Sequence, residues 1–470
     1  MGTELARWSL CVLVAAGATG CASTSIRSDT RTVADLTRMP IAGVADAEVD
    51  PELAAEARAL LEKPLDVEAA VRVALLSNRN LRAELREMGI PRGRLVQAGL
   101  LPNPSFEVEL VPERTSAYSL RVEYDLTALV LAPIRAHAAA PEVDAARFEA
   151  AASVVDLGYH VRAAFYAVMA TQEQLALANR WLDAFAASRD AAQAISGAGN
   201  IRKLDFDVQD AAYQEARVAV ADIELAANEA REAVARELAL HGTETGFIVA
   251  DTLPPVPASP ELPEGLETRV LRASFDLQAK KSQLQAVGRS AGLASVEGWL
   301  PDIVVDGHVL EPRAGVTGLD NGTVYSGGLR ASVPIFDRKQ GTAAGLDAEF
   351  DGLLERYFGA ANDLRSRARV SRAHLITAHG RALLYQNSIV PARSRVTQES
   401  ILQYNAMQIS VFRLLQARRD ELASQLGEID AKRAYWTARA ALDALVAGGK
   451  AAPDDKHGSQ LGTEPGSGGD

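Results

Sequence analysis

The sequence has few aromatic residues, almost no cysteine and no strongly basic run. Aromatic residues make up 5% of the 470 residues, whereas 48% are hydrophobic and alanine fills whole segments such as 136–152. This composition favours helices that pack through small side chains over a bulky globular core. The net charge of −12 and the lack of a Lys/Arg stripe argue against nucleic acid as a partner.

Motifs for catalysis and for metal binding are also missing. The sequence has no G-x-S-x-G, H-E-x-x-H or G-x-x-x-x-G-K segment, so it shows no nucleophile elbow, zinc helix or P-loop. His374 and His379 lie five residues apart, which places them about 140° apart around a helix. His137, His160 and His308 are isolated. We therefore expect no enzyme activity, no cofactor and no metal site.

The chain begins with a segment typical of export signals. Residues 8–22 form an apolar run too short to span a bilayer, and we expect residues 1–20 to be a signal peptide. The tetrapeptide ATGC that ends at Cys21 resembles the lipobox of bacterial lipoproteins, and the other cysteine, Cys11, lies inside the signal. We predict a lipid anchor at Cys21 and, because Ala22 follows it, an outer-membrane destination. An ordinary signal peptide cut near Ala22 is the alternative.

Two halves of similar order follow an extended N-terminal segment, residues 21–64. Short phrases recur about 200 residues apart in the same order, for example Leu101-Pro102 and Leu300-Pro301. The proline-rich stretch 251–264 cannot continue a helix and separates the halves. We expect one repeat over 65–250, a second over 265–447, and a Gly/Ser-rich disordered tail over 448–470.

Each half contains two segments with strand periodicity and two with helix periodicity. Polar and apolar residues alternate over about 104–112, 118–128, 302–311 and 324–335, which suits a membrane strand or a soluble half-buried strand. Heptad seams of small apolar residues predict long helices over about 137–196, 202–241, 340–393 and 408–447. Residues 142–196 alone would span roughly 80 Å as a helix. The predicted fold class is mainly α with a small β part.

Four strands per chain cannot stand alone in lipid, because every backbone N–H and C=O must be paired there. If these strands cross a membrane, several chains must share one barrel, and a trimer would supply twelve strands and twelve long helices. Charged strand residues would then face the lumen together with Arg330. The predicted pore-lining charges are Glu107, Glu109, Arg121, Glu123, Asp125 and Asp306.

Several phrases in this order resemble the TolC-like outer membrane efflux proteins, in particular their lipoprotein branch. They are AGLLPNP before the first strand, GWLPD before the third and VPIFDR after the fourth, with GNI and YN at the helix breaks. The resemblance covers about 65–447. It implies a homotrimer with a 12-stranded β-barrel in the outer membrane and an α-barrel in the periplasm, whose helical tips meet an adaptor protein that connects to an inner-membrane pump.

The helix breaks carry the residues that the resemblance places at the periplasmic tip. Gly197, Gly199 and Met407 are expected at the hairpin turns. Many relatives narrow the closed end with acidic side chains, but the corresponding positions of the second hairpin hold Arg413 and Gln416. We predict that Asp205 and Asp207 pair with Arg413 or Arg418 to hold the tube shut. Solvated helix-end charges are the alternative.

The resemblance implies a duct that passes substrate outward and takes its energy from the inner-membrane pump. Acidic strand faces favour cations slightly through the field in the pore. We therefore expect an export system of the resistance-nodulation-division type for heavy-metal cations or drugs. Type I protein secretion is the alternative within this class, and a non-conducting coiled-coil lipoprotein of the envelope is the alternative outside it.

Overall fold

The computed structural model describes residues 24–41, 43–45, 51–110, 116–249, 252–312 and 323–450. The predicted lipid site Cys21, the signal peptide and the tail beyond Lys450 lie outside these residues. The chain divides into two compact units. The first contains residues 1–30, 86–149 and 278–359, and the second contains 31–85, 150–277 and 360–470.

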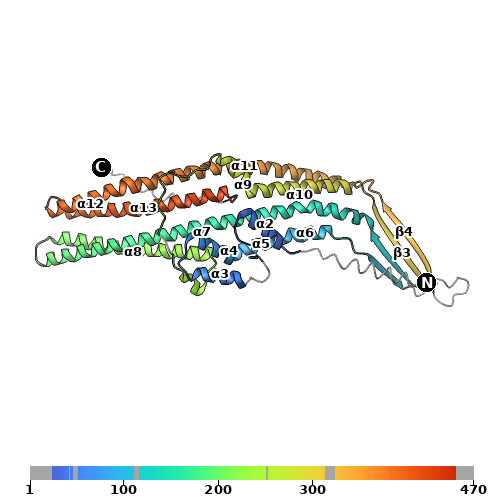
Figure 1. The fold of residues 1–470 in the computed structure, drawn as a ribbon, viewed down its shortest axis with the longest axis horizontal. Helices are drawn as coiled ribbons and strands as arrows, with labels where there is room; N and C mark the ends of the chain where they lie inside the picture. The colour runs from blue at the N-terminus through green and yellow to red at the C-terminus, as the bar shows by residue number, and fades with distance from the viewer. Residues whose placement is uncertain are drawn as a thin grey trace, which may run out of the picture. The chain divides into compact units, whose positions relative to one another are not determined.

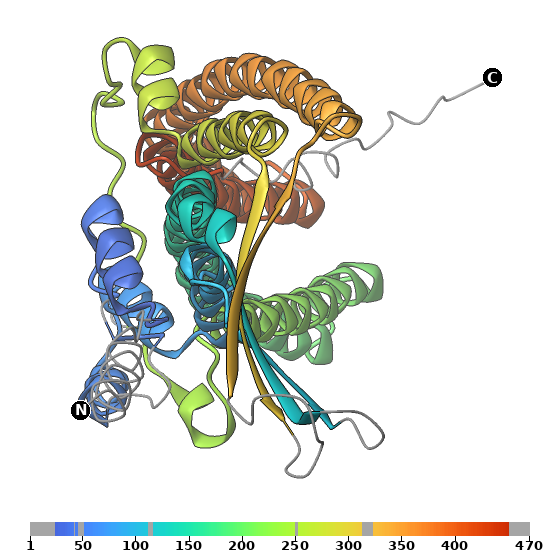
Figure 2. The ribbon, with the colours of Figure 1, turned by 90° about the vertical axis from the view of Figure 1, so that its right-hand side faces the viewer.

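The first unit carries the only sheet among the described residues. Its strands are β1 (Ser105–Leu110), β2 (Ser116–Asp125), β3 (Asp302–Pro312) and β4 (Val324–Ser332). They form one antiparallel sheet in the order β1-β2-β3-β4, and Figure 2 shows β3 and β4 running side by side. Helices lead into and out of the strands. They are α6 (Gly89–Gly99), the start of α7 (Leu126–Gly197), most of α10 (Phe275–Glu297) and the start of α11 (Gln340–Leu384).

The second unit is built on two long helical hairpins (Figure 1). The first pairs the rest of α7 with α8 (Lys203–Glu237), and the second pairs α12 (Val390–Asn405) with α13 (Val411–Val446). Alanine fills much of the core, as in Ala151, Ala368 and Ala441, which are all 0% exposed. Small side chains let the helices approach closely. The observed long helices and the small sheet confirm the predicted fold class, which is mainly α with a small β part.

Short elements complete the chain. They are α2 (Arg27–Thr37), α3 (Pro51–Leu61), α4 (Val67–Ser77), α5 (Arg79–Glu87), the 3₁₀ turn η1 (Gly242–Gly246) and α9 (Leu266–Ala273). No described helix combines the length and the hydropathy needed to cross a membrane.

The prediction of an extended segment over 21–64 is wrong where α2 and α3 form. Pro51 is the first residue of α3, a position where its missing N–H costs nothing. The residues after it are strong helix formers, PELAAEARALL.

Two helix limits also differ from the predicted ones. The strand predicted over 118–128 ends at Asp125, whose Oδ1 accepts the N–H of Ala128 at 2.8 Å, and α7 therefore begins at Leu126, eleven residues before the predicted start at 137. The helix predicted to end at 393 continues through a π-helical segment, η2 (Tyr385–Ile389), into α12. Pro391 is the second residue of α12, just after this segment, where the altered hydrogen-bond pattern tolerates a residue without an N–H.

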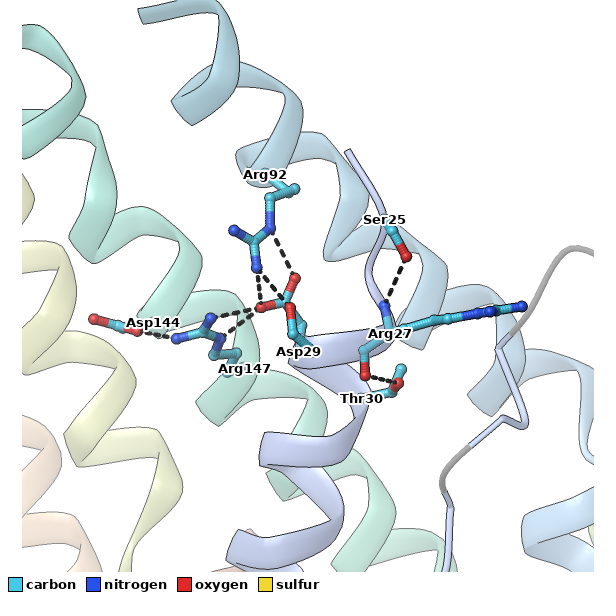
Figure 3. Close-up of polar contacts among 8 residues, drawn as sticks. Ser25, Arg27, Asp29, Thr30, Arg92, Asp144 and Arg147 are labelled. Atoms are coloured by element: carbon cyan, nitrogen blue, oxygen red, sulfur yellow. Dashed lines mark hydrogen bonds and ion pairs between the residues drawn. The ribbon is translucent and has the colours of Figure 1, made fainter. Parts of the chain in front are cut away.

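The N-terminal segment is held in the first unit by a buried carboxylate (Figure 3). The side chain of Asp29 on α2 is 0% exposed and accepts hydrogen bonds from Arg92 on α6 and Arg147 on α7. The shortest contacts are 2.7 Å to Arg92 Nη2 and 2.6 Å to Arg147 Nη2. Arg147 also binds Asp144 at 2.6 Å. Three segments that are distant in the sequence are thus joined at one carboxylate.

Candidate functional sites: the charged sheet face and the hairpin tips

The register of the sheet places charged and apolar residues on opposite faces. Residues directly opposite each other in neighbouring strands share a face. One row on the polar face is Glu107, Arg121, His308 and Ser326, and the neighbouring row on the apolar face is Val108, Leu120, Val309 and Tyr325. The alternation predicted from the sequence therefore continues in register across all four strands.

Ion pairs organise the polar face. Arg121 Nη1 lies 3.1 Å from Glu107 Oε2 on the neighbouring strand. Glu123 lies directly opposite Asp306, an unfavourable pairing of like charges, and Arg330 Nη2 approaches Glu123 Oε1 to 3.6 Å. All six predicted pore-lining residues have the register of this face, and carboxylates outnumber the two arginines.

One of these residues, Asp125, has a different main role. Its carboxylate caps the first turn of α7, so it terminates β2 instead of joining the row of ion pairs. Glu109 is exposed and lies opposite Ser119.

Gly328 is a site residue that the sequence interpretation missed. A Cβ on Gly328 would lie 2.5 Å from Asp306 Oδ1, so the glycine provides the space that this carboxylate occupies. Two consecutive glycines inside a strand pattern, Gly327 and Gly328, were the available signal, because glycine in a strand marks a close approach.

The opposite face of the sheet exposes large apolar side chains. Phe106, Val108, Tyr325 and Leu329 are between 64% and 77% exposed. A contiguous exposed apolar surface of this kind requires a partner or lipid. Among the described strands, both edge strands, β1 and β4, also have one side without a neighbour.

The two hairpin tips have the same backbone geometry. In the first tip the N–H of Asn200 donates to the carbonyl of Ile195 at 3.0 Å, and Gly199 has φ +76°. In the second, the N–H of Gln408 donates to Gln403 at 2.8 Å, and Met407 has φ +61°. Both are Schellman motifs with a left-handed residue at the end of the helix.

Gly197, Gly199 and Met407 therefore lie where the sequence placed them, at the ends of α7 and α12. Met407 is unusual because a bulky residue rarely takes positive φ, and it is 94% exposed. Gly197 is the last residue of α7.

The predicted ion pair between Asp205 and Arg413 or Arg418 does not form within the chain. Asp205 instead binds Arg202, at 3.0 Å between Nε and Oδ2, because Arg202 precedes it by one helical turn. This hydrogen bond raises the pKa of Arg202. Arg413 and Asp207 are exposed.

The other predicted tip residues belong to α13. Gln416 Nε2 donates to Asp420 Oδ1 at 2.8 Å, and Asp420 also pairs with Arg393 on α12 at 2.8 Å. Burial lowers the pKa of Arg418, and the nearby Glu421 opposes this shift.

Near their tips, the two hairpins are joined by an apolar cluster and an ion pair. The cluster contains Phe185, Ala212, Val411 and Leu415, and the ion pair links Arg419 on α13 with Glu215 on α8. The sequence interpretation missed both connections, because periodicity identifies the apolar stripe of a helix but not the helix that it contacts.

The described residues contain no group of three or more His, Cys, Asp or Glu side chains that could hold a metal ion.

Comparison with known proteins identifies the fold. No model of a known protein family matches the chain. The cobalt-zinc-cadmium resistance protein CzcC of Cupriavidus metallidurans is 24% identical over 394 residues, which cover 82% of this chain and 90% of that protein. Crystal structures of CusC, described in connection with transmembrane channel formation, match with a TM-score of 0.69 at 17% identity over 82% of this chain and 92% of CusC. The outer-membrane channel OprN matches with a TM-score of 0.69 at 19% identity, over 82% and 90%.

The chain therefore has the fold of these outer-membrane channels. This confirms the TolC-like resemblance inferred from the sequence. It also accounts for a mainly helical chain that carries one small sheet with a charged face and an exposed apolar face.

Proposed function

We propose that this chain forms the outer-membrane duct of a tripartite export system for heavy-metal cations. The observation that carries the proposal is the open-edged sheet, with charges on one face and exposed apolar side chains on the other. In lipid the free edges must be paired, so β1 of one chain would pair with β4 of the next. Three chains would give a closed barrel of twelve strands with the charged face around the lumen.

The cargo is inferred from two observations. CzcC is named for resistance to cobalt, zinc and cadmium. The polar sheet face carries Glu107, Glu109, Glu123 and Asp306 against Arg121 and Arg330, which gives a lumen field that favours cations. An adaptor protein at the hairpin tips and an inner-membrane pump would supply cargo and energy. Cys21 would carry a lipid anchor in the outer membrane, which the mass of the mature N-terminal peptide tests.

A matched pair of arginine substitutions tests the orientation of the sheet. Leu329 is on the exposed apolar face and Ser326 is on the charged face of the same strand. Leu329→Arg should remove the protein from the outer membrane, because arginine facing lipid costs about 2–4 kcal/mol at the midplane, whereas Ser326→Arg should be tolerated.

The measurement is the amount of trimer in outer-membrane fractions, together with tolerance of a deletion strain to cobalt, zinc and cadmium. We expect wild type and Ser326→Arg to restore tolerance. Equal loss, or equal tolerance, of the two variants would contradict the assignment of the faces. Normal membrane assembly without any effect on metal tolerance would contradict heavy-metal cations as the cargo and favour drugs or secreted polypeptides.

A further inference from the structure

Exposed apolar side chains gather at the end of the sheet where the strands meet the helices. Asp302 pairs with Ser332 at this end, and α10 and α11 lead to it in Figure 1. Five large apolar side chains of the first unit lie next to it and are between 45% and 91% exposed; these residues, here called the junction surface, are Leu100, Leu101, Trp299, Ile335 and Phe336. Apolar side chains gathered and exposed in this way indicate a partner.

The turn between β4 and α11 is ordered by its own hydrogen bonds. Asp337 Oδ1 accepts the N–H of Lys339 at 2.9 Å, and Gln340 Oε1 accepts the N–H of Arg338 at 2.7 Å. Gln340 Nε2 also donates to the carbonyl of Phe336 at 3.1 Å. The turn is therefore well fixed, yet the side chain of Phe336 is 91% exposed and adds little apolar burial to its own chain.

The connection before β3 is held against this turn. A Cβ on Gly298 would lie 2.2 Å from the carbonyl oxygen of Arg338, so the approach of the two connections requires glycine at this position. The guanidinium group of Arg338 lies over the ring of the next residue, Trp299, with Cζ 4.7 Å from the ring centroid. Two separate connections thus present an indole ring and a cation together.

The polar groups beside the junction surface have no acceptor among the described residues. Two other tryptophans of the described chain, Trp181 and Trp436, donate their Nε1–H to a neighbouring residue at 3.0 and 2.9 Å, whereas Trp299 Nε1 donates to no described residue. Neither Arg338 nor Lys339 forms an ion pair with a described residue. An anionic acceptor from outside the chain would satisfy these donors.

A phospholipid leaflet offers apolar and anionic groups in the matching order. The exposed apolar row of β4, with Tyr325 and Leu329, continues past the end of the strand through Val333 to the junction surface. If the row faces acyl chains, as in the proposed duct, the junction surface lies at the depth of the headgroups. Indole rings prefer this depth because their body is apolar and their N–H is polar, and cations meet phosphate there.

We propose that the junction surface binds the headgroup layer of a phospholipid leaflet. The ring of Trp299 and the side chain of Phe336 enter the layer, and Arg338 and Lys339 bind phosphate. This contact sets the depth at which the sheet ends in the membrane. The proposal rests on the proposed function, because the sheet must lie in a membrane for the junction surface to reach headgroups.

Quenching of tryptophan emission by brominated lipid tests the position of Trp299. The full-length protein is reconstituted in phosphatidylcholine vesicles that carry bromine either near the headgroup end or at the terminus of the acyl chains. In Trp181→Phe/Trp436→Phe, Trp299 is the only tryptophan besides Trp8 of the predicted signal peptide. We expect bromine near the headgroup end to remove most of the Trp299 emission and terminal bromine to remove much less.

Trp299→Phe/Trp436→Phe is the matched control, because it keeps Trp181 of the second unit, whose emission should respond to neither lipid. If the double variants do not fold, the quenching lost from wild type in Trp299→Phe alone gives the same information. The proposal is overturned if Trp299 emission is unchanged, is quenched most by terminal bromine, or is quenched no more than that of Trp181. Unchanged emission that is also shielded from soluble iodide would assign the surface to another protein chain.

A titration with short-chain phosphatidylglycerol in nonionic detergent tests the cations. The readout is Trp299 emission in the Trp181→Phe/Trp436→Phe background. Lys339→Gln should weaken lipid binding about fivefold, because one cation near anionic lipid is lost. Lys203→Gln, at an exposed position of the first hairpin tip, is the control and should bind like its parent. Equal binding by these two variants would overturn the phosphate contact.

Conductance of the same samples in planar bilayers separates this proposal from the proposed function. Conductance with unquenched Trp299 would overturn the headgroup contact and leave the duct standing. Quenched Trp299 without conductance would reject the duct and keep the headgroup contact. Absence of both would reject both.

Discussion

Two aspartates of this chain form ion pairs with arginine in opposite surroundings. Asp29 is 0% exposed and is bound by Arg92 and Arg147, whereas Asp205, at a hairpin tip, is 23% exposed and is bound by Arg202, whose side chain is 77% exposed. A buried pair is expensive to break because the remaining charges are left without water. An exposed pair can open and re-form with other partners. The first arrangement is suited to holding a fold, and the second to a contact that can be exchanged for another.

The largest effect on stability is expected at the buried aspartate, Asp29. Asp29→Asn would leave Arg92 and Arg147 without their shared carboxylate and should lower the free energy of unfolding by about 3–5 kcal/mol. Urea titration of the detergent-solubilised protein, followed by far-ultraviolet circular dichroism, measures the change. Asp35→Asn, at an exposed position of the same helix, is the control. Equal transition midpoints for the two variants would show that the buried pair does not hold the fold.

A smaller effect on stability is expected from substituting the residue with positive φ at each of the two tips. Gly199→Ala should loosen the first tip and Met407→Gly should tighten the second, each by about 1 kcal/mol, because only glycine takes positive φ without strain. Hydrogen exchange at the amides of Asn200 and Gln408, which close the two Schellman motifs, reports this locally. Rates that change in the same direction in both variants would refute the account of the tips.

The smallest effect on stability is expected at Asp205, where conduction is the informative measurement. Asp205→Arg should change the unfolding transition little, because the ion pair it removes is formed with an exposed arginine and is worth about 0–1 kcal/mol, but it should raise the closed-state conductance of the trimer if Asp205 helps to hold the tube shut. Arg202→Ala removes the partner seen within the chain and keeps Asp205. An increase in both variants would assign the effect to the Arg202–Asp205 pair, and no increase in Asp205→Arg would reject the gate.

The sequence allowed most of the architecture to be predicted, because its long elements have strong periodicity. Alternation across β1 to β4 and heptad seams along α7 and α13 depend on local spacing, which a single sequence displays. The start of α7 was missed because an Asp125 cap competes with continued strand alternation. Helix α3 was missed because its polar, weakly periodic segment was predicted to be extended.

The candidate sites could be predicted only in part, since partners depend on tertiary contacts. The strand charges lie on one face, as alternation required. The partner of Asp205 was predicted from charge alone, and a residue one helical turn away is closer than one on another hairpin. The buried Asp29 was missed for the same reason, as its partners are 63 and 118 residues away.

The central claim is that three chains close their sheets into a conducting tube with a cation-favouring lumen. Single-channel recording of the purified trimer in planar lipid bilayers, under a potassium chloride gradient, tests it most directly. The account predicts discrete conductance steps and a reversal potential shifted toward that of potassium. It also predicts a weaker shift in Glu107→Gln, which removes one carboxylate of the charged face. Absence of conductance would contradict the account and favour a non-conducting envelope lipoprotein.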